Sequence, residues 1–167
     1  MLSGSGAIAS LQAIPDGPEG TAATLSIMRT ITRGAKKRLP VVEFARSLVR
    51  HLPPKDWAAE VEALHRFVRD EIRYVRDVRG VETVAIPEYT LTTGQGDCDD
   101  KAVLLASLLE AIGHPTRFTA IGFQPGAFNH VFAETKIGPR WVALETTEPV
   151  AMGWHPDKFA SIMYRYN

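Results

Sequence analysis

Residues 93–115 read TGQGDCDDKAVLLASLLEAIGHP and contain the only cysteine of the chain, Cys98. A loop of glycines and acids precedes Cys98, and an apolar run with few polar residues follows its first turn. This run predicts a largely buried helix over residues 98–112, with Gly113 as its C-terminal stop. The stretch raises the question whether Cys98 is a small buried hydrophobe or a nucleophile placed at a helix N-terminus.

The predicted start of this helix would influence the thiol in two opposing ways. Asp97 is a plausible N-cap, and Asp100 could complete an acidic analogue of the capping box. Cys98 would then lie in the first turn, where N–H groups favour a thiolate and could stabilise an oxyanion. However, Asp97, Asp99 and Asp100 raise a thiol pKa from its reference of about 8.5, and the dipole is worth only about 0.3–1 kcal/mol.

A cation beside Cys98 is therefore needed for a reactive thiolate, and histidinium is the usual one. With such a partner, we expect alkylation of Cys98 to have a pH midpoint well below about 8.5. A midpoint at or above that value would favour the alternative that Cys98 is buried and inert, as free cysteines commonly are.

The remaining sequence predicts helices first and strands afterwards. Three helices are expected, over residues 21–33 (where a strand would also fit), from Pro40 to Leu52, and from the N-cap Asp56 to Ile72. The apolar face of the third helix, which is expected to be buried, consists of Trp57, Val61, Leu64, Val68 and Ile72. Residues 76–97 are expected to form a loop. Strands are expected over 116–123, 130–137 and 140–147. This order predicts an α+β domain, with the Cys98 helix packed on an antiparallel sheet.

His130 is the favoured partner of Cys98 because it begins a predicted strand, where a sheet end could face a helix N-terminus. His51 and His65 are expected at surface or packing positions, His114 in a turn remote from the thiol, and His155 in a loop. A two-residue hairpin loop at Gly138-Pro139 would place Ile137 opposite Arg140. The same register would place Glu145 on the face of His130, as its diagonal neighbour. Glu145 could then orient the imidazole, although a solvated carboxylate is the alternative for this residue.

Composition excludes several classes of protein. The 19 Lys and Arg residues balance the 19 Asp and Glu residues, so no global field attracts nucleic acid or an anionic membrane. One cysteine cannot form an internal disulfide, and without a CxxC pair a thiolate-rich zinc site is not expected. The sequence contains no run of 18 apolar residues, which a membrane span would need. Its N-terminus does not have the pattern of a secretory signal, so a cytoplasmic location is expected.

The segments GDCDDKAVLLASLLEAIGHPTRF, NHVFAE and RWVALETTEP together resemble the transglutaminase-like superfamily of papain-like thiol enzymes. The resemblance covers about residues 57–148 and implies Cys98 as nucleophile and His130 as base, with Glu145 where relatives usually carry Asp. Glu is one methylene longer, so the backbone must adjust or the triad is imperfect. Residues 1–20 are rich in Gly, Ser and Pro and are expected to form an extended arm, followed by a single transglutaminase-like domain over 21–167.

The chain is also similar to small transglutaminase-like proteins of Mu-like tailed phages and prophages. The segments that carry this similarity are PPKDW, RYVRD, PEYTL, GDCDDK and LETTEPV. A Cys–His pair of this kind predicts acyl transfer or amide hydrolysis on protein or peptide substrates, without a cofactor or metal. Gln95 or Tyr74 would be a second oxyanion donor beside the backbone N–H of Cys98. The alternative is a structural or assembly component of a virion, in contact with other phage proteins, that keeps the fold with little or no catalysis. The location would be the cytoplasm of the bacterial host or the virion.

Overall fold

A computed structural model of the chain describes residues 14–77 and 83–167. Its helices are α1 (Pro18–Ala35), α2 (Leu39–Val49), α3 (Trp57–Glu71), α4 (Pro87–Thr93) and α5 (Cys98–Ala111). Its strands are β1 (Arg73–Tyr74), β2 (Gln95–Gly96), β3 (Thr116–Gly122), β4 (His130–Ile137), β5 (Arg140–Leu144) and β6 (Ser161–Tyr166). Most of the predicted arm, residues 1–13, lies outside the described residues, and α1 begins at Pro18.

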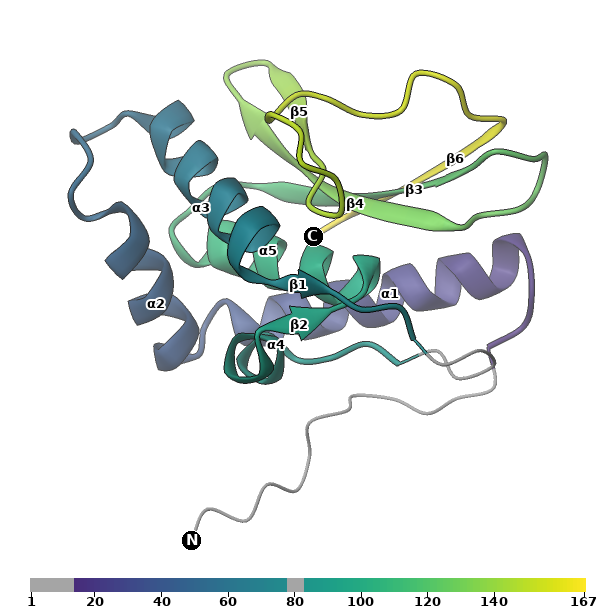
Figure 1. Cartoon of the computed structure of the whole chain (residues 1–167), viewed down its shortest axis with the longest axis horizontal. Coiled ribbons are helices and arrows are strands. Elements are labelled where there is room, and N and C mark those ends of the chain that lie inside the picture. Colours follow the sequence, from purple (N-terminus) through teal and green to yellow (C-terminus); the bar gives the residue numbers. More distant parts are fainter. Residues whose placement is uncertain (1–13, 78–82) are drawn as a thin grey trace, which may run out of the picture.

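Four strands form one antiparallel sheet in the order β5-β4-β3-β6, and β1 and β2 form a separate parallel pair. The helices lie on one side of the four-stranded sheet (Figure 1). The connection from β5 to β6 begins against α3, where Arg69 donates to the backbone oxygen of Val150, and its later part runs over the other side of the sheet, where His155 stacks on Phe132. The fold is therefore α+β with the predicted antiparallel sheet. The β4–β5 hairpin has the predicted register, because Ile137 is paired with Arg140 and Ala133 with Leu144.

Helix α5 lies at the centre of the fold, between the sheet and the other helices. It contacts α1, α2, α3 and α4 on one side and β3 and β4 on the other. Its residues from Ala102 to Leu109 are all buried, which explains why the sequence after the first turn is nearly free of polar side chains. The predicted buried helix is confirmed, and this burial fixes Cys98 at the edge of the core.

Some of the predicted elements differ from the structure. Trp57 is 59% exposed, so the buried line of α3 begins one turn later, at Val61. Residues 87–93 form the short helix α4 rather than a loop; Pro87 occupies its first position and Gly94 ends it in the left-handed conformation. The third predicted strand ends at Leu144 rather than at residue 147, and β6 was not predicted.

Candidate active site

Cys98 is the first residue of α5, and the predicted capping box forms around it. Asp97 accepts a hydrogen bond from the backbone N–H of Asp100 at 3.0 Å, and the Asp100 carboxylate accepts one from the N–H of Asp97 at 3.3 Å. Asp100 also accepts the N–H of Ala85 at 2.8 Å. A Cβ on Gly96 would lie 2.6 Å from the Cβ of Asp100, so glycine is needed there for the acid to fold back. The acids of the GDCDD sequence thus fix the loop that presents the thiol.

The environment of Cys98 favours the neutral thiol. Burial raises its pKa well above the ordinary value, and the charges of Asp99 and Asp97 raise it further; the backbone amide of Val131 lowers it only in part. The thiol donates a hydrogen bond to Oδ1 of Asp99 at 3.6 Å. The sequence predicted a thiolate held by histidinium, and this prediction is not supported. Among the described residues, no hydrogen bond joins the Cys98 sulfur to the His130 ring.

His130 and Glu145 are brought together by the β4–β5 hairpin. Nε2 of His130 and Oε2 of Glu145 form a hydrogen bond. The other carboxylate oxygen accepts the backbone N–H and the hydroxyl of Thr147, at 2.7 and 2.8 Å. Burial raises the pKa of Glu145, but the bonds from His130 and Thr147 outweigh it and hold that pKa below its ordinary value. Glu145 is only 1% exposed, so it is an oriented carboxylate and not a solvated one.

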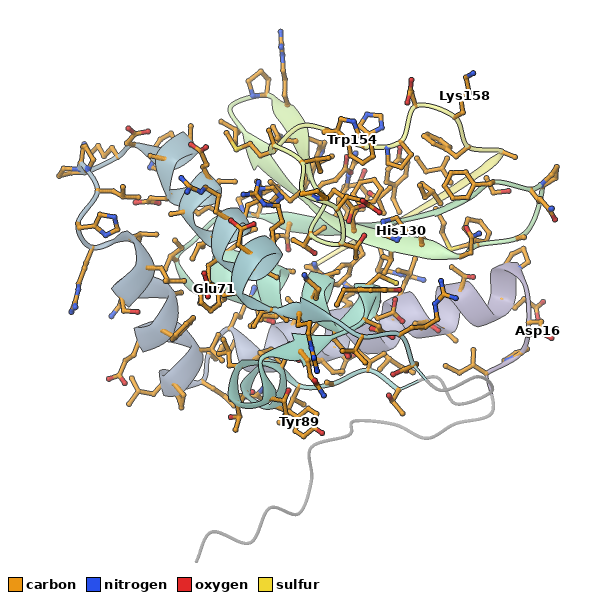
Figure 2. The ribbon with its side chains drawn as sticks, in the orientation of Figure 1. Asp16, Glu71, Tyr89, His130, Trp154 and Lys158 are labelled. Atoms are coloured by element: carbon orange, nitrogen blue, oxygen red, sulfur yellow. The ribbon has the colours of Figure 1, made fainter. Side chains whose placement is uncertain are left out.

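Cys98 and His130 line one cavity of about 560 Å³. Its lining also includes Tyr74, Asn129 and the first turns of α1 around Thr21 and Thr24. His130 lies at the sheet, while Trp154 lies above it in the connection that follows β5 (Figure 2). Cys98 and His130 therefore lie on the walls of the same cavity.

The predicted second oxyanion donors are placed differently from one another. Tyr74 lines the cavity and is 43% exposed. Gln95 is not among the residues that line it, and its side-chain oxygen accepts a hydrogen bond from Arg73 at 2.8 Å. Of the two, Tyr74 is the better placed to reach a ligand beside Cys98.

Two buried residues near the site were missed by sequence reasoning. His65 is fully buried, and its Nε2 lies 2.6 Å from the backbone oxygen of Glu145. Lys101 is 1% exposed and donates to the backbone oxygen of Ile72 at 2.6 Å, at the C-terminal end of α3. Burial lowers the pKa of Lys101 to about 8. The signal for Lys101 was a lysine, three residues after Cys98, inside an otherwise apolar helix.

In residues 14–77 and 83–167, no three His, Cys, Asp or Glu side chains are grouped so that they could hold a metal ion. No helix in the part of the chain that the structure describes combines the length and the hydropathy needed to cross a bilayer.

The family model of the transglutaminase-like superfamily matches residues 42–146. This range is well over half of the chain and contains Cys98, His130 and Glu145, so the protein belongs to the transglutaminase-like superfamily. No curated protein matches the sequence.

Solved structures show the same fold. A protein of Cytophaga hutchinsonii, provisionally described as a cysteine protease, is 21% identical with a TM-score of 0.54. The match covers 77% of this chain and 46% of that one. A provisionally described protease of Parabacteroides distasonis is 16% identical with a TM-score of 0.61, over 83% of this chain and 31% of the other. The chain thus spans less than half the length of either structural neighbour.

Proposed function

We propose that this protein acts on amide bonds of proteins or peptides through the thiol of Cys98, with His130 as base and Glu145 as the residue that orients it. The observation that carries this proposal is the hydrogen-bonded His130–Glu145 pair in the cavity that Cys98 also lines. A buried carboxylate bonded to one imidazole nitrogen fixes the ring and leaves the other nitrogen for proton transfer. The family and its structural neighbours, which are described as proteases, support the same class of chemistry.

The proposed reaction has two halves. The sulfur of Cys98 attacks the amide carbonyl carbon while its proton passes to Nδ1 of His130, and the carbonyl oxygen becomes an oxyanion near the N–H of Cys98. The C–N bond then breaks, the leaving amine takes the proton from His130, and a thioester remains. A second nucleophile, water or an amine, gives its proton to His130 and attacks the thioester, which releases Cys98. Water gives hydrolysis or deamidation, and a lysine amine gives an isopeptide bond.

The raised pKa of Cys98 changes how this reaction would start. A neutral resting thiol cannot attack until it loses its proton, so His130 must act as a general base during the attack. A bound substrate would exclude water and bring the sulfur and the imidazole into productive contact, because catalytic hydrogen bonds often tighten only in the complex. In this scheme, Glu145 stabilises the imidazolium that forms.

A second candidate is a structural or assembly component of a phage virion that retains the fold without turnover. The neutral thiol favours it, since a cysteine with a raised pKa is typically unreactive. Fold alone does not decide between the two functions. The similarity to proteins of Mu-like phages supports a phage origin under either proposal, and assembly would then place the protein among other phage structural proteins.

The two candidates are separated by Cys98→Ser. Purified protein is incubated with a glutamine-containing protein and a tagged primary amine, and separately with a thiol-directed probe. The enzymatic proposal expects Cys98→Ser to remove product formation by several orders of magnitude, because a hydroxyl has a far higher pKa than a thiol. The fold should remain, since the buried residues of α5 that carry its packing are unchanged.

Leu105→Ala is the matched control, because Leu105 is fully buried on the same helix and touches no proposed chemistry. The cavity left by this substitution should lower the free energy of unfolding by about 2–5 kcal/mol. This loss of stability should reduce either function. Product formation that survives in Cys98→Ser would end the enzymatic proposal. In the native host, unchanged particle yield with Cys98→Ser but reduced yield with Leu105→Ala would support the structural candidate.

A further inference from the structure

His65 makes its hydrogen bond at the point where Glu145 leaves the sheet. The ladder between β4 and β5 ends with the pair Ala133 and Leu144, so Glu145 is the first residue beyond it. The backbone oxygen of Glu145 lies 2.6 Å from Nε2 of His65, which comes from the middle of α3. The helical layer thus holds the main chain of Glu145 at a position that the strand pairing no longer fixes.

The bond determines the proton position of His65. Burial lowers the pKa of His65 below its ordinary value, so the ring is neutral near pH 7. A neutral ring carries one N–H, and the carbonyl of Glu145 can only accept, so the proton lies on Nε2. Nδ1 is then an acceptor, and it is buried without a hydrogen-bond partner among the described residues.

This arrangement is a poor source of stability. One hydrogen bond is made, and one buried acceptor is left unpaired, which offsets much of the gain. A fully buried position on α3 could instead hold an apolar side chain of similar size without this penalty. The bond of His65 is therefore better explained by where it places Glu145 than by what it adds to the free energy of unfolding.

The helix that carries His65 is itself tied to the helix that carries Cys98. Nζ of Lys101, on α5, donates to the backbone oxygen of Ile72 at 2.6 Å and reaches that of Arg69 at 3.4 Å. These oxygens lie at the C-terminal end of α3, where a cation is favourable. A chain of polar contacts therefore runs from α5 through Lys101 to α3, and through His65 to Glu145 and His130.

We infer that His65 is a positioning residue: its bond to the backbone of Glu145 sets the carboxylate where it can hold the His130 ring. This inference rests on the proposed function. His65 touches neither substrate nor the reacting atoms, so it acts only through Glu145.

The first test follows the imidazole protons by NMR of protein with ¹⁵N-labelled histidine and needs no substrate. In the wild type, the ring nitrogens of His65 should report a proton on Nε2 and none on Nδ1. A proton on Nδ1 instead would overturn the inference without any variant. The Nε2 proton of His130, which bonds to Glu145, should give a signal protected from exchange with water.

Three variants then separate positioning from stability. His65→Leu removes the donor at a similar size and should broaden the His130 proton signal through exchange. His65→Gln places an amide N–H near the position of Nε2 and should restore the signal. His114→Leu is the matched control, since it removes another buried histidine, whose Nε2 lies 2.8 Å from Glu60. It should lower the melting temperature without changing the His130 signal.

The second readout is the rate at which Cys98 is acylated by p-nitrophenyl acetate, measured below the melting range of every variant. His65→Leu should lower this rate on the order of 100-fold, as expected for a misplaced group, and His65→Gln should recover most of it. An unchanged His130 signal in His65→Leu would overturn the inference. Equal losses of acylation rate in His65→Leu, His65→Gln and His114→Leu would also overturn it. If the wild type is not acylated while the NMR results hold, the proposed function fails and the positioning role stands.

Discussion

Two opposing influences act on the thiol of Cys98. Its place in the first turn of α5 favours the thiolate, whereas burial and the carboxylates of Asp99 and Asp97 favour the thiol. The helix end contributes only about 0.3–1 kcal/mol at an exposed site, so the acids and burial prevail. The sequence contained these acids, but how deeply the sulfur is buried depends on the packing of β4 against α5.

The pH dependence of alkylation tests this balance. We expect the rate with iodoacetamide to keep rising above about pH 8.5, because a raised thiol pKa delays formation of the thiolate. Asp99→Asn removes a negative neighbour and should move the midpoint to lower pH. Glu43→Gln, on the exposed side of α2, should leave it unchanged. A wild-type midpoint well below that value would show instead that His130 holds a thiolate at rest.

At the scale of elements, the capping box at the start of α5 contains a buried carboxyl group, that of Asp97, whose pKa is raised. Burial and the charges of Asp99 and Asp100 raise the pKa of Asp97 from 3.8 to about 8. Between these two values, the folded protein holds a proton that the unfolded chain has released. Asp97 therefore makes the folded state less stable as pH rises from about 4 to about 8.

Asp97→Asn should reduce this pH dependence. Asn caps a helix about as well as Asp and cannot titrate, so the hydrogen bond to the N–H of Asp100 is kept. We expect the melting temperature of the variant to fall less than that of the wild type between about pH 5 and about pH 8. Asp56→Asn is the matched control, because Asp56 caps α3 through the same type of bond at an exposed position. Equal pH profiles for Asp97→Asn and the wild type would contradict the buried state of Asp97.

At the scale of the whole molecule, one hydrophobic core joins the helices to the sheet. It includes Leu25 and Met28 from α1, Leu64 from α3, Leu105 from α5 and Phe118 from β3. Each of α1, α2, α3 and α4 contacts α5, and α5 in turn contacts β3 and β4 of the sheet. We therefore propose that residues 21–167 form one cooperative unit.

Thermal unfolding should accordingly be a single transition. The tryptophans report on different regions, since Trp57 begins α3, Trp141 lies in β5 and Trp154 lies in the following connection. We expect the melting curve from tryptophan fluorescence to coincide with that from far-UV circular dichroism, as in a two-state domain. The variant Trp57→Phe leaves only the two tryptophans on the sheet side, and its curves should still coincide. Separate transitions would show that the helices and the sheet unfold independently.

The sequence by itself determined the features that depend on nearby residues. The capping box of Asp97 and Asp100, the buried helix α5 and the β4–β5 register are local consequences of spacing, turn length and apolar period. The same register placed Glu145 within reach of His130. Strand β6 was missed although SIMYRY alternates, and α4 was missed because seven residues with three threonines carry a weak helical signal.

Only the tertiary structure decided the state of the thiol and the surroundings of Glu145. The charge of Cys98 depends on how far its sulfur lies from water, and this burial comes from segments that are distant in the sequence. His65 precedes Glu145 by 80 residues, and no local pattern marks it as its partner. Spacing along the chain fixes which side chains share a face, whereas desolvation and contacts between layers exist only once α3, α5 and the sheet have packed together.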